Sequence, residues 1–423
     1  MRNNQAQNVI KDLYNVFDPS VPVDAHDPRY VDFAEVRNSP KILQAMAKSI
    51  RFSEKPTVQL YSGHRGCGKT SELNQLIADL RNGAPPYFVV NCEADALLNL
   101  EDVRSLDVLF GVARRVIEES SHAGIKLQPN KFIAFWQKLG DDLINLDVTK
   151  VDVGNDIAKV GVELKQNASL REIIRQKLEK SDLESYLEAI NEIIHSARQQ
   201  LQAKGYADLV VVVDNLDRVL RAPIPGTNTN LQEEMFITNS SQMTSLDCFV
   251  IYTLPPALIH SPKGMGMGMV YGANPQMLPM VPVKTRGGEI YQPGIDKLIE
   301  ALNKRINAVG ASFQQVFHNQ QLAERLCEFS GGYIRLLLLL MRTALTIVDK
   351  LPIDQEAVED ALRQSKRLYL NGIFAEHWSV IDQVEKSKQI VAGEGCLELL
   401  NNLAILGYFD QDAWWDVNPV LRY

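Results

Sequence analysis

Residues suited to phosphate chemistry are concentrated in one glycine-rich stretch, Gly63-His64-Arg65-Gly66-Cys67-Gly68-Lys69-Thr70. Its three glycines let the backbone turn tightly enough for several N–H groups to point at one anion, at the positive end of a following helix. Lys69 can then reach the outer phosphates, and the Thr70 hydroxyl can ligate Mg²⁺. The sequence therefore predicts a nucleoside triphosphate site; a chance match in a surface loop is the alternative. The predicted nucleotide contacts are Gly63, His64, Arg65, Gly66, Cys67, Gly68, Lys69, Thr70 and Ser71.

Two elements must position this loop, a strand before it and a helix after it. Val58, Leu60 and Tyr61 form the short apolar run of a buried strand. From Ser71 to Leu80, leucines and Ile77 recur at the spacing of one helix face. Strand, glycine loop and helix together are the context in which this motif binds phosphate.

A second strand carries the candidate metal-binding acid. Residues 209–213 are a leucine and four valines, followed by Asp214. Such a run needs burial on both faces, as in the centre of a parallel sheet, and the carboxyl ends of such strands are where ligands bind. We predict that Asp214 holds the water shell of Mg²⁺. Runs at 87–92, 248–254 and 277–284 predict three more strands, so the expected fold is α/β with a five-stranded parallel sheet.

Composition bounds the class of protein. The chain has 423 residues, 45% of them hydrophobic, a net charge of -8 and a pI near 5.5, which indicates several globular domains without a global attraction to nucleic acid. Its five cysteines form no C-x-x-C pair, so neither a zinc site nor a disulfide framework is expected. The first residues lack the apolar core of a signal peptide, and the longest apolar run, 334–348, contains two arginines. We expect a cytoplasmic protein with no membrane span.

The segment between residues 100 and 205 is predicted to be an insertion. Helical patterns cover 101–120 and 129–145, whereas 151–164 alternates apolar and polar residues and predicts a hairpin. From Leu183 to Leu201 the apolar residues alternate steps of four and three, which indicates either a partner-binding seam or a helix packed on its own domain. Later, Lys263 to Met269 alternates glycine and methionine. This pattern favours a disordered loop; an adaptable contact surface formed by the methionines is the alternative.

The last third of the chain reads as helical. The sequence predicts helices at 294–309, 320–329 and 334–349. The pair Gly331-Gly332 lies between the last two and is typical of a helix end. A further helix and short strands near the carboxyl end are similar to a winged-helix domain. The predicted regions are an N-terminal extension at 1–55, a P-loop core at 56–290, a helical lid at 291–350 and a winged-helix-like domain at 351–423.

The order of these motifs resembles the AAA+ and STAND branch of P-loop ATPases over residues 30 to 350. The resemblance implies ATP or ADP with Mg²⁺ as ligands, Thr253 as sensor 1, and Arg335 as sensor 2 on the γ-phosphate; a salt bridge from Arg335 to a core acid is the alternative. It also makes Pro28, Tyr30 and Val36 candidates for a wall over the adenine, unless this segment is a plain linker.

Two departures from the common AAA+ pattern are informative. Asp214 is followed by Asn215 rather than by Glu, and the next acid is Asp217, as in the NACHT and KAP groups. Asp217 is thus the candidate water-orienting base, with a helix N-cap as its alternative role. No arginine lies between Thr253 and residue 280, where many AAA+ proteins carry a finger, so slow hydrolysis is expected.

The resulting hypothesis is a slowly ATP-hydrolysing switch whose nucleotide state controls assembly with itself or with a separately encoded effector, with anti-phage defence as a use known from the family. One alternative is a DNA-acting initiator or transposition ATPase. From residue 352 on, however, the chain has twelve acidic residues and six Lys or Arg residues. This acidic excess disfavours binding to nucleic acid, because such binding depends on neutralising phosphates. The other alternative is a non-enzymatic scaffold that holds ADP.

Overall fold

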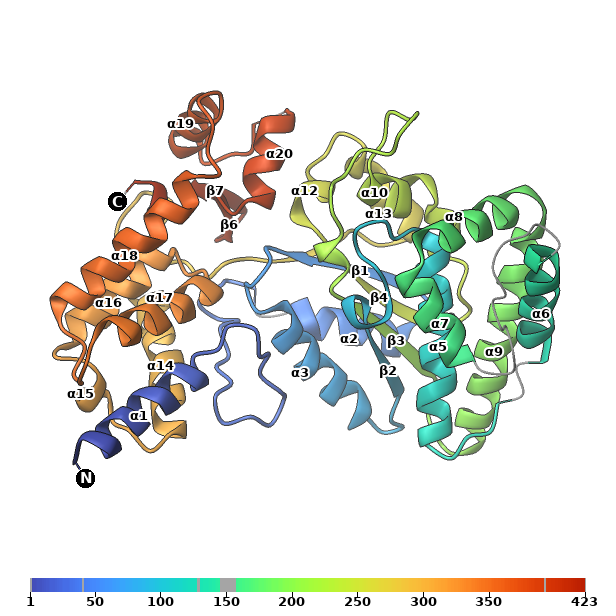
Figure 1. Cartoon of the computed structure of the whole chain (residues 1–423), viewed down its shortest axis with the longest axis horizontal. Helices are drawn as coiled ribbons and strands as arrows, with labels where there is room; N and C mark the ends of the chain where they lie inside the picture. The colour runs from blue at the N-terminus through green and yellow to red at the C-terminus, as the bar shows by residue number, and fades with distance from the viewer. Residues whose placement is uncertain (1, 40–41, 128–129, 145–156, 392, 423) are drawn as a thin grey trace. The chain divides into compact units, whose positions relative to one another are not determined.

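The structure, a computed structural model, describes residues 2–39, 42–127, 130–144, 157–391 and 393–422 (Figure 1). It divides into two units. The first consists of Met1–Ala45, Ser62–Leu76 and Met277–Tyr423, and the second of Met46–Tyr61 and Ile77–Gln276.

A five-stranded sheet with the order β2-β3-β4-β1-β5 confirms the predicted α/β fold class. β3 pairs in parallel with β2 and with β4, so that Val211 lies opposite both Val90 and Val250. All six residues of β3 are buried, which explains its run of valines. The fifth strand is shorter than predicted. The strands are β1 (Val58–Gly63), β2 (Phe88–Glu93), β3 (Leu209–Asp214), β4 (Phe249–Leu254) and β5 (Gln276–Leu278).

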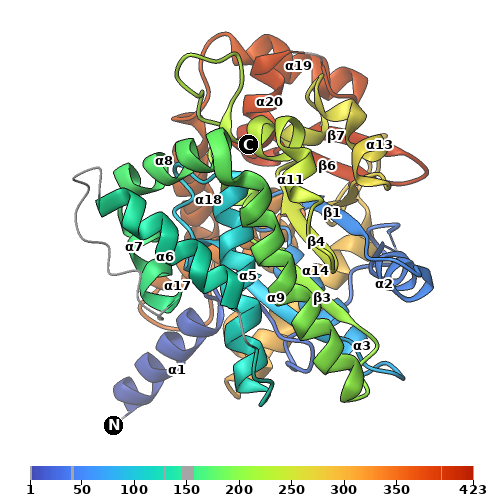
Figure 2. The same ribbon diagram turned by 90° about the vertical axis from the view of Figure 1, so that its right-hand side faces the viewer.

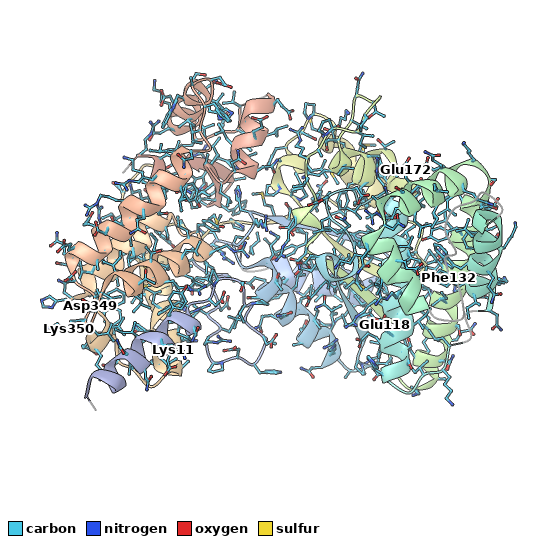
Figure 3. The ribbon with its side chains drawn as sticks, viewed as in Figure 1. Lys11, Glu118, Phe132, Glu172, Asp349 and Lys350 are labelled. Atoms are coloured by element: carbon cyan, nitrogen blue, oxygen red, sulfur yellow. The ribbon has the colours of Figure 1, made fainter. Side chains whose placement is uncertain are left out.

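In the second unit a layer of helices covers one face of the sheet. Figure 2 shows α5 and α9 over β2 and β3. Phe132 of α6, labelled in Figure 3, stacks on Phe110 of α5 with ring centroids 5.9 Å apart, so aromatic packing joins the layer. Its elements are α4 (Ala94–Leu97), α5 (Ser105–His122), α6 (Asn130–Ile144), α7 (Ile157–Gln166), α8 (Ala168–Lys177), η1 (Leu178–Asp182) and α9 (Leu183–Ala203).

The hairpin predicted at 151–164 is wrong where the structure describes it, because its second half belongs to helix α7; residues 151–156 lie outside the described residues. Val160 and Leu164, four residues apart, pack on the core, whereas Val162 between them is 48% exposed. Val160, Val162 and Leu164 alternate as in a strand, but the first and third have the four-residue spacing of a helix face and the second is an exposed valine.

The disordered loop predicted at Lys263 to Met269 is also wrong. Residues there form η4 and α13, because Met267 is buried and Lys263 Nζ donates to Glu233 Oε2 at 2.6 Å. Met265 and Met269 are 87% and 92% exposed. The elements between β3 and β5 are η2 (Leu216–Arg218), α10 (Leu231–Glu233), η3 (Glu234–Thr238), α11 (Ser240–Met243), α12 (Pro256–Ile259), η4 (Gly264–Gly266) and α13 (Met267–Tyr271).

The first unit contains the glycine loop, the helices of the predicted lid and a carboxyl-terminal two-stranded sheet. α19 and α20 precede the antiparallel strands β6 and β7, in the helix, helix, hairpin order of a winged helix. No helix among the described residues has the length and apolar character needed to cross a membrane. The helices not yet given are α1 (Arg2–Val16), α2 (Ile42–Phe52), α3 (Lys69–Arg81), α14 (Gln292–Ala308), α15 (Phe313–Val316), α16 (Gln320–Ser330), α17 (Ile334–Ile347), α18 (Gln355–Leu370), α19 (His377–Ser387), α20 (Glu394–Asn401) and η5 (Pro419–Leu421), and the strands are β6 (Ile405–Phe409) and β7 (Ala413–Val417).

Candidate nucleotide-binding site

The glycine loop of the first unit has backbone N–H groups that no described acceptor satisfies. Gly66 and Gly68 have φ angles of +86° and +105°, which a residue with a side chain adopts only with strain. Among the described residues, the N–H groups of Arg65, Gly66 and Gly68 donate to no acceptor. Such a group of free N–H donors at the start of α3 fits an anion.

The ammonium of Lys69 lies inside the same loop. Its Nζ donates to the Gly63 carbonyl at 2.6 Å and to the His64 carbonyl at 3.1 Å, and the residue is 6% exposed. The ammonium is thus held by two carbonyl groups of the loop itself, and its contact with phosphate stays a prediction. Arg65 in this loop is exposed.

The predicted sensor Arg335 lies against the glycine loop. Its backbone N–H donates to the Gly66 carbonyl at 3.3 Å. Its side-chain Nε is buried without a hydrogen-bond partner, and no acid among the described residues forms an ion pair with its guanidinium. The salt bridge to a core acid, the alternative role, is therefore not formed in the described part of the chain. The Nε–H group of Arg335 is therefore available to a further acceptor.

Among the glycines of the loop, Gly66 is the position at which a side chain is least tolerable. A Cβ there would lie 2.8 Å from both Arg335 Cβ and Tyr333 Cε2. We expect Gly66→Ala to lower the free energy of unfolding by about 1–2 kcal/mol for the left-handed backbone and by a further 1–3 kcal/mol or so for overpacking. Thermal unfolding measures the sum.

Gly124→Ala is the matched control for this substitution, because Gly124 has a φ of +68° and no described residue lies within 4 Å of its would-be Cβ. That variant should lose the backbone contribution alone. Equal destabilisation of the two variants would contradict the close contact between the loop and Arg335.

A buried ion pair under the loop was not predicted from the sequence. Arg37, 1% exposed, donates to Glu72 Oε1 at 3.1 Å and to the Cys67 carbonyl at 2.7 Å, and the Tyr30 hydroxyl donates to Glu72 Oε2 at 3.3 Å. Burial raises the pKa of Glu72, although Arg37 opposes this effect. Val36, a predicted adenine-wall residue, is buried and Pro28 is exposed. The segment 30–37 is therefore a support of the loop; its role over the adenine stays a prediction.

Two more predicted contact residues have partners in the first unit. His64 is 1% exposed, and its Nε2 accepts the Gly407 N–H of β6 at 2.9 Å. This bond requires the unprotonated form at Nε2. The Ser71 hydroxyl accepts the Val23 N–H at 3.0 Å. The His64 side chain thus links the glycine loop to the carboxyl-terminal strands.

In the second unit, Asp214 and Thr253 meet at the end of β3. Asp214 Oδ1 accepts the Asn215 N–H at 2.7 Å, and Asn215 has a left-handed φ of +67°. The fully buried Thr253 hydroxyl donates to the Val213 carbonyl at 3.4 Å and accepts the Leu216 N–H at 3.1 Å. Thr253 therefore holds the turn that carries Asp214; direct contact with nucleotide stays a prediction.

Asp95, just after β2, is a positioning residue that sequence reasoning missed. Its Oδ1 accepts Asn215 Nδ2 at 2.8 Å, and its other oxygen pairs with Arg218. Asp217 lies between these two partners in η2 and is partly exposed. Glu93, the last residue of β2, is the register partner of Asp214. No local pattern indicates these contacts, because Asp95 lies more than a hundred residues from Asn215.

The sheet, the glycine loop and the helix that begins at Lys69 together define an α/β P-loop NTPase fold. No protein-family model and no curated protein matches the chain. Among solved structures, the chain is similar to the ORC2 protein of Aeropyrum pernix, described as ADPNP–ADP complexes, with 13% identity and a TM-score of 0.45, covering 96% of this chain and 94% of that one. It is also similar to Cdc6p of Pyrobaculum aerophilum, with 11% identity, a TM-score of 0.41 and the same coverage.

Proposed function

We propose that this protein is an ATP-binding, slowly ATP-hydrolysing regulatory switch of the AAA+ and STAND group. In this proposal the N–H groups of the glycine loop and Lys69 bind the phosphates, and Arg335 senses the terminal one. The bound nucleotide would control assembly with further copies or with a separately encoded effector, in the cytoplasm.

The observation that carries the proposal is the position of the glycine loop among the elements of the first unit. Gly66 accepts the Arg335 N–H at the start of α17, and His64 accepts the Gly407 N–H of β6. The Tyr408 hydroxyl, next to Gly407, donates to the Gly331 carbonyl before α17 at 2.7 Å. A change in loop conformation would therefore disturb both the lid helix and β6. That arrangement supports a switch, because a ligand shifts an equilibrium through differential contacts.

Hydrolysis would use the acids of the second unit. We propose that Thr70 and Asp214 hold Mg²⁺ and that Asp217 orients the attacking water. Among the described residues no group of three or more His, Cys, Asp and Glu side chains could hold a metal. Phosphate and water oxygens would therefore complete the six ligands that Mg²⁺ prefers. β1, which leads into the glycine loop, and β3, which ends at Asp214, belong to one sheet with β4 between them.

The DNA-acting alternative has less support from the carboxyl-terminal region. α20, the second helix of its helix pair, has the sequence EGCLELLN with two glutamates and no Lys or Arg. The second helix of such a pair is the one that enters a DNA groove, where phosphates repel carboxylates. We therefore favour a protein partner.

The test is amide hydrogen exchange of residues 405–409 with ADP, with a non-hydrolysable ATP analogue and without nucleotide. Exchange in β6 should differ between the two nucleotides in the wild type. Arg335→Ala should bind both nucleotides and make their exchange patterns converge, because the residue that distinguishes the γ-phosphate is lost.

Arg363→Ala on α18 is the matched control, since Arg363 is exposed and pairs with Asp360, three residues earlier on the same helix. It should keep the wild-type difference. Identical exchange with both nucleotides in the wild type would contradict the switch itself, whereas a persistent difference in Arg335→Ala would contradict only the role of Arg335.

A further inference from the structure

An open groove of about 920 Å³ runs along α9 in the second unit. Its apolar floor comes from Leu183 and Leu187, which are partly buried. Three acids of α9, Glu184, Glu188 and Glu192, also line the groove. The start of α6 and the loop before β4 complete the groove.

The groove corresponds to one end of the apolar seam seen in the sequence. Further along α9, Ile190, Ile194 and Leu201 are fully buried and pack on the core of their own unit. The later part of the seam therefore packs in the core, whereas Leu183 and Leu187 at its start line the groove.

The charges of the groove are unbalanced. Glu184, Glu188 and Glu192 follow at four-residue steps on one face, about 6 Å apart along the axis, where like charges destabilise a helix. None of the three forms an ion pair among the described residues. Glu192 Oε2 is buried and has no hydrogen-bond partner among the described residues, so it can accept a further donor.

The other charged groups that line the groove form no ion pair with these acids among the described residues. His195 pairs with Asp247 at 2.9 Å, and Lys131 at the start of α6 is exposed. Asn191 is fixed by bonds to the Ser245 carbonyl and from the Asp247 N–H, so the groove wall is tied in place. An apolar floor beside a regular row of carboxylates is complementary to a helix with apolar residues on one face and cations four residues apart.

We propose that this groove binds a basic amphipathic helix of a partner protein. Apolar side chains of that helix contact Leu183 and Leu187, and its Lys or Arg residues pair with Glu184, Glu188 and Glu192. The proposal does not rest on the nucleotide function, because every residue that it uses lies in α6, α9 or the loop before β4.

The test uses the full chain and a labelled synthetic peptide of about 18 residues, long enough to form a helix, with leucines on one face and lysines four residues apart. Fluorescence anisotropy should show saturable binding that weakens as salt increases. Glu188→Lys should weaken binding about tenfold, because it replaces an attraction by a repulsion.

Three controls make the test specific. Glu54→Lys changes the net charge equally at an exposed position before β1 and should leave binding within about twofold of the wild type. Leu187→Ala should weaken binding through the apolar floor, independently of charge. A peptide of the same composition with a central proline should bind poorly, because proline breaks the helix.

Equal loss in Glu54→Lys and Glu188→Lys would overturn the proposal in favour of non-specific attraction. If the proline peptide binds as tightly as the leucine and lysine peptide, the proposal that the groove binds a helix is wrong. Absence of saturable binding by the leucine and lysine peptide would overturn the groove as a docking site for basic helices.

Discussion

Lys69→Ala should weaken ATP binding by at least about 100-fold. The ammonium lies within the glycine loop, where it donates to the Gly63 and His64 carbonyls, and its hydrogen bonds to phosphate would be charge-assisted at about 1.5–3 kcal/mol each. Every 1.4 kcal/mol or so corresponds to a factor of ten in affinity. Isothermal titration with ATP and Mg²⁺ measures the change, and far-ultraviolet circular dichroism should confirm that the fold is kept.

Lys55→Ala is the matched control, because Lys55 is an exposed lysine just before β1 and should leave the affinity unchanged. If Lys69→Ala binds ATP as the wild type does, the assignment of this loop to phosphate binding is wrong. Equal loss in both variants would instead indicate a non-specific effect of net charge.

Asp217→Asn should lower the rate of ATP hydrolysis by about 10²–10⁴-fold, the usual contribution of a positioned acid or base, while ATP still binds. Asp214→Asn should impair Mg²⁺-dependent binding and hydrolysis together, because a neutral amide is a weaker ligand for a hard cation. Steady-state phosphate release and nucleotide titration, both run with and without Mg²⁺, separate the two roles.

Glu93→Gln discriminates between the two candidate bases. Glu93 ends β2 as the register partner of Asp214, and we therefore take its carboxylate as the second candidate base. Wild-type hydrolysis in Asp217→Asn together with loss in Glu93→Gln would assign the base to β2 and refute the resemblance to the NACHT and KAP spacing at this strand.

Several elements could be predicted from local sequence because their signal is contained within a few residues. The valine run that ends in Asp214 occupies β3 with the bounds expected, and the helix after the glycine loop begins at Lys69. Burial on both faces of a central strand favours apolar residues at successive positions, so the run from Leu209 to Val213 is a strong signal. Glycine at Gly66 and Gly68 is likewise a local necessity, since both adopt positive φ.

Weak or short patterns misled the prediction where tertiary packing decided the outcome. Val162 is apolar yet exposed, so the sequence pattern suggested a hairpin where the chain forms helix α7. The glycine and methionine stretch is ordered because Lys263 bonds to Glu233, thirty residues earlier in the chain, and because Met267 is buried. In both segments the intrinsic preference is small, so contacts with distant residues determine the structure.

The sequence by itself determined the presence of a P-loop, the acid at the end of β3 and the α/β class, because each depends on backbone conformation and periodicity within one segment. Only the tertiary structure decided what surrounds them. The Arg37 and Glu72 pair, the His64 and Gly407 bond and the Asp95 contacts join residues between 35 and 343 positions apart. Such contacts depend on how whole elements pack, and no spacing along the chain encodes which side chains will meet.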